Sequence, residues 1–315
     1  MRVREIDPPN APVELVDALY ALEVEAHEEL LPLEPVRARD EAVSYWRHPP
    51  SDQKRRNWLA DEGADVVGMA GLYVYGPAFV HVEVFVTADH RRRGVGSALL
   101  AALCAAAREE KVKSFFGDHV TDGGAAFAAH HGAVDDQREV RSLLRLRDAE
   151  LPEPLLPDGH SLLSWIGSCP DELVESYAAA RSAMSDAPAP GGAELDEGTV
   201  DAVRRSEETG LRRGREIRVT VALDPAGSVV SFTEVRLTPG ATTVGTNDTG
   251  TVAAARGQGL ARAVKLELLR CLRRDRPETE LVITMNAEHN AAMRHINTTI
   301  GFVPTATLTS TVLTL

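Results

Sequence analysis

The stretch Arg91-Arg92-Arg93-Gly94-Val95-Gly96-Ser97 recurs in altered form as Arg256-Gly257-Gln258-Gly259-Leu260-Ala261-Arg262. Both copies read Arg-x-x-Gly-x-(Gly/Ala), and both lead into a leucine- and alanine-rich segment whose spacing predicts a helix. Gly259 lies 165 residues after Gly94, about half the length of the 315-residue chain. A repeat at this interval predicts a duplicated domain, not a solenoid of short units.

The segments around the two glycine-rich stretches follow the same order in both halves of the chain. Runs of β-branched and aromatic residues predict strands, and apolar residues at helical spacing predict helices. The first half is predicted to have helices at 12–30, 37–48, 94–110 and 122–131, and strands at 57–62, 66–75, 80–87, 113–119 and 140–146. The second half is predicted to have helices at 170–184, 199–213, 257–273 and 290–300, and strands at 217–223, 229–237, 243–252, 280–285 and 305–315. Each half is therefore predicted to be a mixed α/β (α+β) sheet.

A proline-rich segment separates the two halves. Residues 151–159 read Leu-Pro-Glu-Pro-Leu-Leu-Pro-Asp-Gly, and three prolines with one glycine disfavour both a helix and a central strand. We therefore predict an N-terminal domain at 1–150, a linker at 151–159 and a C-terminal domain at 160–315.

The composition excludes several classes of protein. A net charge of −13 disfavours nucleic-acid binding, and the chain lacks the run of about 18 apolar residues that a membrane helix needs. The three cysteines, Cys104, Cys169 and Cys271, are too few and too scattered for a disulfide framework or a thiolate zinc site, and no metal site is predicted. These features, with an N-terminus unlike a signal peptide, predict a cytoplasmic protein.

The glycine-rich stretches are suited to binding a phosphate group. Glycine lets a ligand approach the backbone, and the first turn of the following helix offers unpaired N–H groups and the positive end of the helix dipole. Other phosphate loops fit less well, because the Walker lysine motif and the third glycine of a dinucleotide fingerprint are both missing. A glycine turn without a ligand is the alternative for either copy alone, and the duplication disfavours it.

The motif resembles the acetyl-CoA-binding motif of the GNAT superfamily of N-acetyltransferases. Asn286-Ala287-Glu288-His289-Asn290, leading to Ile300-Gly301-Phe302, is similar to the last strand and helix of that family. Residues 127–133 form a weaker version in which Ala133 replaces the usual phenylalanine. The resemblance implies two consecutive GNAT (acyl-CoA N-acyltransferase) domains, an arrangement similar to mycothiol synthase and other actinobacterial acetyltransferases.

The resemblance also implies where acetyl-CoA would bind. The pantetheine arm would follow the strand before each glycine turn, at Val84, Phe85 and Val86 or at Thr249, Gly250 and Thr251. The pyrophosphate would lie over Arg92, Arg93, Gly94, Val95, Gly96 and Ser97, or over Gly257, Gln258, Gly259, Leu260, Ala261 and Arg262. Arg91, together with Arg92 and Arg93, would supply charge for further phosphates, and Arg256 opens the second copy of the motif. Asn290 is expected to contact the cofactor, and a helix N-cap is its alternative and compatible role.

The same resemblance suggests Glu83 and Asp248 as catalytic bases, because each carboxylate lies eight residues before the first arginine of its motif. A salt-bridged or solvated strand carboxylate is the alternative for both. The family's usual tyrosine, which protonates the leaving thiolate, is replaced by Ala128 in the first half and by Asn297 in the second. The general acid is therefore left open.

These observations favour an acetyl-CoA-dependent N-acetyltransferase that acts on a small-molecule primary amine. The C-terminal half is favoured for catalysis because its motifs are more complete. Two alternatives stay open: a non-catalytic protein that binds acyl-CoA, and catalysis in the N-terminal half. The acidic segment 186–197 suggests a cationic acceptor, and the chain is expected to be a monomer or a homodimer.

Overall fold

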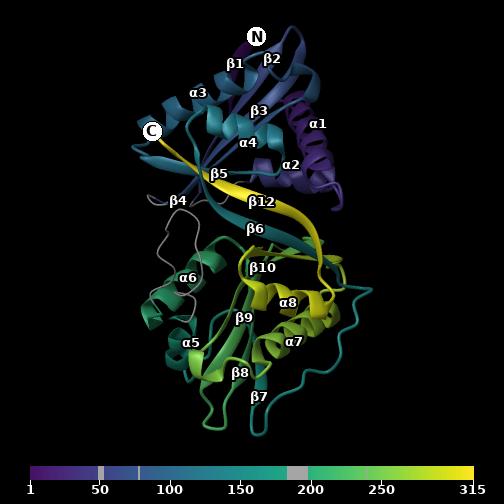
Figure 1. The fold of residues 1–315 in the computed structure, drawn as a ribbon, viewed down its shortest axis with the longest axis vertical. Helices are drawn as coiled ribbons and strands as arrows, with labels where there is room; N and C mark the ends of the chain where they lie inside the picture. The colour runs from purple at the N-terminus through teal and green to yellow at the C-terminus, as the bar shows by residue number, and fades with distance from the viewer. Residues whose placement is uncertain (49–52, 77–78, 183–197, 239) are drawn as a thin grey trace. The chain divides into compact units, whose positions relative to one another are not determined.

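The computed structural model describes residues 1–48, 53–76, 79–182, 198–238 and 240–315 (Figure 1). The chain forms two compact units, of which unit 1 contains residues 1–139 and 305–315 and unit 2 contains residues 140–304. The predicted acidic segment 186–197 lies outside the described residues. Among the described residues, no helix has the length and apolar character of a membrane span.

Unit 1 is a six-stranded sheet with helices on both faces. Its strands occur in the order β1-β2-β3-β4-β5-β12, and they pair in an antiparallel manner except for the parallel pair β4–β5. The elements are β1 (Arg2–Ile6), α1 (Val13–Leu30), α2 (Arg39–Arg47), β2 (Lys54–Glu62), β3 (Asp65–Gly76), β4 (Phe79–Val86), α3 (Val95–Glu109), β5 (Ser114–His119), α4 (Asp122–His130) and β12 (Val303–Thr314).

Unit 2 repeats this plan with the strand order β6-β11-β10-β9-β8-β7. The pair β10–β11 is parallel and corresponds to β4–β5 of unit 1. The elements are β6 (Val134–Arg145, of which residues 140–145 belong to unit 2), β7 (Ser161–Ile166), α5 (Val174–Arg181), α6 (Val200–Arg212), β8 (Glu216–Leu223), β9 (Val229–Leu237), β10 (Thr243–Thr251), α7 (Leu260–Asp275), β11 (Leu281–Ala287) and α8 (Ala291–Ile300). The predicted mixed α/β class is therefore confirmed.

The predicted helices and strands are all present, but the last strand of each half pairs differently from the sequence order. The strand predicted to end the second half, β12, pairs with β5 from Thr309↔His119 to Thr314↔Ser114 and so belongs to unit 1. The strand predicted to end the first half, β6, lies next to β11 in the strand order. The predicted domain boundary at 151–159 concerns the repeat in the sequence and stays a prediction.

Two further strands are absent from the predictions. The first strand of each sheet, β1 or β7, is an edge strand that pairs with β2 or β8. An edge strand is only half covered, so polar residues are tolerated there. In β1 these are Arg2, Arg4 and Glu5. The alternation that marks a half-buried strand is therefore weak at this position.

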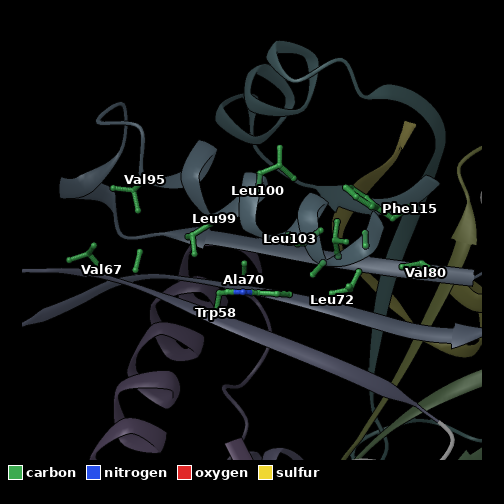
Figure 2. Close-up of a cluster of buried hydrophobic side chains, with 14 residues drawn as sticks. Trp58, Val67, Ala70, Leu72, Val80, Val95, Leu99, Leu100, Leu103 and Phe115 are labelled. Carbon is green, nitrogen blue, oxygen red and sulfur yellow. The ribbon is translucent and has the colours of Figure 1, made fainter. Parts of the chain in front are cut away.

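The core of unit 1 follows from alternation along its strands. Trp58 and Leu72 face α3, whose Leu99 and Leu103 are fully buried against the sheet (Figure 2). On the other face, Leu59 and Phe85 pack with Val16 and Leu19 of α1 and Trp46 of α2. Since successive strand residues point to opposite faces, His81, Glu83 and Phe85 of β4 share the face that α1 and α2 cover.

Candidate functional site

Both glycine turns have the same backbone geometry. Gly94 is the N-cap of α3 with φ of 84°, and Gly259 is the N-cap of α7 with φ of 80°. A Cβ atom at either glycine would meet no described atom within 4 Å, so the space beside each helix start is open. Arg92 has φ of 60° where unit 2 has Gly257 at 77°, which shows that the turn needs a left-handed residue.

The first arginine of each motif donates a hydrogen bond to a backbone carbonyl of the preceding strand. Arg91 Nε donates a hydrogen bond to Val86 O at 2.8 Å, and Arg256 Nε donates to Thr251 O at 3.2 Å. Arg91 also forms an ion pair with Glu29, which raises the pKa of the guanidinium. A contact of Arg91 with phosphate stays a prediction, and its visible role is to hold the loop.

The two parallel strand pairs part before they reach the glycine turns. Among the described residues of unit 1, β4 and β5 are in register at the pair His81↔Phe116. In unit 2 the register of β10 with β11 ends at Gly245↔Ile283. The residues predicted to bind the pantetheine arm, 84–86 and 249–251, follow these points and keep their pairing with β3 and β9.

Unit 1 has a cavity of about 460 Å³ at this divergence. Its walls come from α1, α2, β3, β4, β5, α4 and β12. The ionisable side chains that line the cavity are those of Glu23, His27, Arg37, Tyr45, Tyr73, His81, Glu83, Asp118, His119 and His131. The predicted base Glu83 therefore lies in a cavity, together with Val84 and Phe85 of the predicted pantetheine strand.

Glu83 lies among polar groups that carry charge or donate hydrogen bonds. The Tyr73 hydroxyl donates to Glu83 Oε2 at 3.0 Å, and burial raises the pKa of Tyr73 well above its ordinary value. Glu23 forms an ion pair with Arg37 at 3.1 Å. Burial raises the pKa of Glu23, and the charge of Glu83 adds to this effect. The cavity thus presents two interacting carboxylates to a ligand.

A second polar pair bridges the diverging strands. His81 Nε2 lies 3.6 Å from Asp118 Oδ2, and both side chains line the cavity. The Ser310 hydroxyl of β12 donates a hydrogen bond to Asp118. The partner raises the pKa of His81 in spite of burial, which opposes the charge, and the pKa of Asp118 is lowered by its contacts with His81 and Ser310.

The start of α3 lies against α4. Ser97 Oγ and His131 Nε2 are 3.0 Å apart, so the hydroxyl predicted to contact phosphate already has a partner. Burial lowers the pKa of His131. A Cβ atom at Gly96 would lie 3.1 Å from the Phe127 ring, so this glycine allows close packing of the two helices. Ala128, at the family's tyrosine position, lines the cavity without a group that can donate a proton.

In unit 2, the predicted base Asp248 is part of a buried ionic network. Arg181 Nη2 lies 3.1 Å from Asp248 Oδ2, and Arg181 Nη1 lies 3.1 Å from Glu234 Oε2. The side chains of Arg181 and Glu234 are 6% and 4% exposed, whereas that of Asp248 is 37% exposed. Tyr177 donates a hydrogen bond to Glu234 at 3.2 Å. This geometry supports the salt-bridged alternative for Asp248.

The last helix of unit 2 contains two asparagines with different roles. Asn290 caps α8, because its Oδ1 accepts a hydrogen bond from the Met293 amide at 3.1 Å. Asn297 donates from Nδ2 to Asn286 Oδ1 at 2.6 Å, and its own Oδ1 is buried with no partner among the described residues. The N-cap role of Asn290 is thus present, and its contact with the cofactor stays a prediction.

The sequence motifs do not mark several buried or partly buried polar residues of the two units. Glu23 and Arg37 lie in α1 and near α2, and their charges match an ordinary helix surface. Arg181 is hidden at the end of an alanine-rich helix. Lys265 is 3% exposed in α7, and burial lowers its pKa to about 8. No periodic pattern distinguishes such residues from surface charges, so burial in the structure is the signal.

The residues present fit an acyl-CoA molecule at both turns. Open space beside Gly94 and Gly259, helix N-termini and diverging strands are shared by the two units. In unit 1 a cavity continues from this divergence toward α1 and α2. Among the described residues, no group of three or more histidine, cysteine or acidic side chains could hold a metal ion.

Comparison with known proteins agrees with this geometry. The sequence profile of the Acetyltransferase (GNAT) family matches residues 16–132. Two relatives are each named mycothiol acetyltransferase. The relative from Salinispora tropica is 30% identical over 239 residues, 72% of either chain, and that from Amycolatopsis mediterranei is 31% identical over 257 residues, 76% of this chain and 77% of its own.

Solved structures resemble the whole chain. A tandem GNAT protein from the clavulanic acid biosynthesis pathway superposes with a TM-score of 0.75 and 25% identity, over 99% of this chain and 98% of that chain. A GCN5-related N-acetyltransferase from Sphaerobacter thermophilus has a TM-score of 0.73 and 17% identity, over 99% and 95% of the two chains. The second likeness concerns the fold alone.

Proposed function

Because this chain belongs to the GNAT family of acetyltransferases, which use acetyl-CoA as acetyl donor, we propose that it acetylates a small-molecule primary amine in the cavity of unit 1. The observation that carries the proposal is the position of Glu83 in the cavity where β4 and β5 part. The mycothiol acetyltransferase names of the relatives support a small-molecule amine as the acceptor class.

Different parts of unit 1 bind the acetyl donor and the acceptor amine. The open backbone at Gly94 and the start of α3 favour the pyrophosphate, because helix N-termini attract anions. The strand 84–86 directs the acetyl donor toward the cavity, where the donor supplies the thioester carbonyl that the amine attacks. Glu83 and Glu23 attract an ammonium group by charge, and Tyr73 fixes the Glu83 carboxylate.

This assignment differs from the preference for the C-terminal half that sequence motifs suggested. The Asp248 carboxylate already forms an ion pair with the Arg181 guanidinium at 3.1 Å, so a protein cation competes with any substrate group for its oxygens. We therefore propose that Asp248 is a structural partner of Arg181. The glycine turn of unit 2 keeps its predicted capacity to bind acyl-CoA.

The test is a thiol-release assay with a panel of amines and two matched variants. Gly94→Glu places a carboxylate in the open space of unit 1, and Gly259→Glu does the same in unit 2. We expect release of CoA with at least one amine, loss of this activity in Gly94→Glu, and retention in Gly259→Glu. Loss only in Gly259→Glu would move the reaction to unit 2. Absence of release with every amine would favour the non-catalytic alternative.

A further inference from the structure

His81 occupies the point at which the two parallel strands of unit 1 separate. It pairs with Phe116 of β5, and Glu83 follows two residues later on the same face of β4. The rings of His81 and Phe116 are 5.0 Å apart, and Tyr73 of β3 stacks on the other side at 6.1 Å. The imidazole is thus held between two aromatic rings while it lines the cavity.

Asp118 gives the ring a preferred orientation. Its Oδ2 lies 3.6 Å from Nε2 of His81, and Ser310 fixes the carboxylate from β12. The side chains of His81 and Asp118 are 19% and 25% exposed, so water screens the pair only in part. With Nε2 directed at Asp118, Nδ1 is the ring nitrogen that remains to exchange a proton with the cavity.

Burial opposes the protonated form of His81, and the charges of Glu83 and Asp118 favour it and outweigh burial. Glu83 on the same strand and Asp118 on β5 raise the pKa of His81. Tyr73 on β3 is held in its neutral form by burial. Asp118 in turn interacts with His119 on β5 and with Glu139 on β6. A carboxylate ordinarily has a pKa near 4 and an imidazole near 6.5, so the imidazole is the better-matched base near neutral pH.

We propose that His81, oriented by Asp118, accepts the proton that the acceptor amine loses, and that Glu83 holds the ammonium beforehand. The assignment rests on the function proposed above. It uses two residues that the sequence motifs do not mark, and it gives Glu83 a binding role in place of the predicted base.

The proton and electron balance of the step is complete. The ammonium gives one proton to Nδ1 of His81, and the freed electron pair of nitrogen forms a bond to the thioester carbon. The carbon–sulfur bond breaks, and sulfur leaves with the bonding electrons. The second proton of the nitrogen neutralises the thiolate, so no general acid is needed at Ala128. His81 then returns its proton to solvent.

The role of His81 is tested by measuring acetyl transfer and acetyl-CoA binding in variants of the full chain. In His81→Gln we expect kcat to fall about 10²–10⁴-fold, the usual loss for a general base, with acetyl-CoA affinity unchanged. In Asp118→Asn we expect the acidic limb of the kcat/KM profile to move to lower pH, because the carboxylate that raises the His81 pKa is lost. His130→Gln, at an exposed histidine of α4, is the matched control and should keep wild-type activity.

Two results would overturn the assignment, and they are distinguishable. If Gly94→Glu abolishes turnover but His81→Gln retains it within threefold, or the acidic limb of Asp118→Asn does not move, His81 is not the proton acceptor although unit 1 is catalytic. If Gly94→Glu leaves turnover intact, the reaction lies outside unit 1. The proposed function then fails, and the role of His81 fails with it.

Discussion

Replacement of Arg181 by methionine is expected to destabilise unit 2 by about 3 kcal/mol. Removal of one partner from a buried ion pair generally costs about 3–5 kcal/mol, because the other charge stays buried without compensation. Here Glu234 is 4% exposed, and its remaining cation, Arg236 at 2.5 Å, is 17% exposed. This second contact is the reason to expect the lower end of the range.

The matched variant is Asp248→Asn, which removes the outer carboxylate of the same network. Because Asp248 is 37% exposed, its ion pair with Arg181 should contribute about 1 kcal/mol or less. At about 2–4 °C per kcal/mol for a unit of this size, Arg181→Met should lower the melting temperature of unit 2 by about 6–12 °C.

Calorimetry of the full chain would measure both variants, with the transitions of the two units fitted separately. The double variant Arg181→Met/Glu234→Met should recover part of the stability, because it removes the deeply buried Glu234 charge and leaves Arg236, which is 17% exposed, with its hydrogen bond to Ser206. Equal losses in Arg181→Met and Asp248→Asn, or a loss below 1 kcal/mol in Arg181→Met, would refute the buried-network reasoning.

Three further outcomes are expected from unit 1. Raising salt from 0.1 M to 1 M should increase KM for cationic amines, since Glu23 and Glu83 attract them by charge; an unchanged KM would contradict this. Arg92→Gly should raise the unfolding free energy by up to about 1 kcal/mol in denaturant titrations, because φ of 60° strains arginine but not glycine. The folded pKa of His81 is raised, so its pair with Asp118 stabilises the fold below pH 6.5, and this contribution is lost as pH rises through the folded pKa. Asp118→Asn should abolish that part of the pH dependence of unfolding.

The local features of the fold could be predicted because short-range physics determines them. The glycine turns precede α3 and α7, as predicted, since a left-handed residue is needed at the N-cap of each helix. The strands from β2 to β5 and from β8 to β11 were found from β-branched residues and turns between them. The end of β12 is different, because its place in the sheet depends on a distant strand. Its sequence indicates a strand, but its partner β5 lies about 190 residues earlier, and no local pattern specifies that pairing.

The sequence indicates on which strands and turns the candidate site lies, but it does not indicate which side chains contact one another there. The family resemblance predicts a carboxylate at Glu83, and the structure places this residue in the cavity, where its catalytic role stays a prediction. The roles of Arg181 and Asp118 depend on contacts with residues 67 and 37 positions away, Asp248 and His81 respectively. Such pairs form when helices and strands assemble, so a single sequence contains no periodic signal for them. The same long-range contact makes Asp248 a poorer candidate base than its place in the motif suggests.

Catalysis in unit 1 is tested by comparing Glu83→Gln with Asp248→Asn in steady-state acetyl transfer. A hydrogen bond to a charged group contributes about 1.5–3 kcal/mol, so Glu83→Gln should lower kcat/KM for the amine about 10- to 150-fold. Acetyl-CoA binding should stay the same, and Asp248→Asn should keep kcat/KM within threefold of wild type. Loss of turnover in Asp248→Asn with normal turnover in Glu83→Gln would contradict catalysis in unit 1.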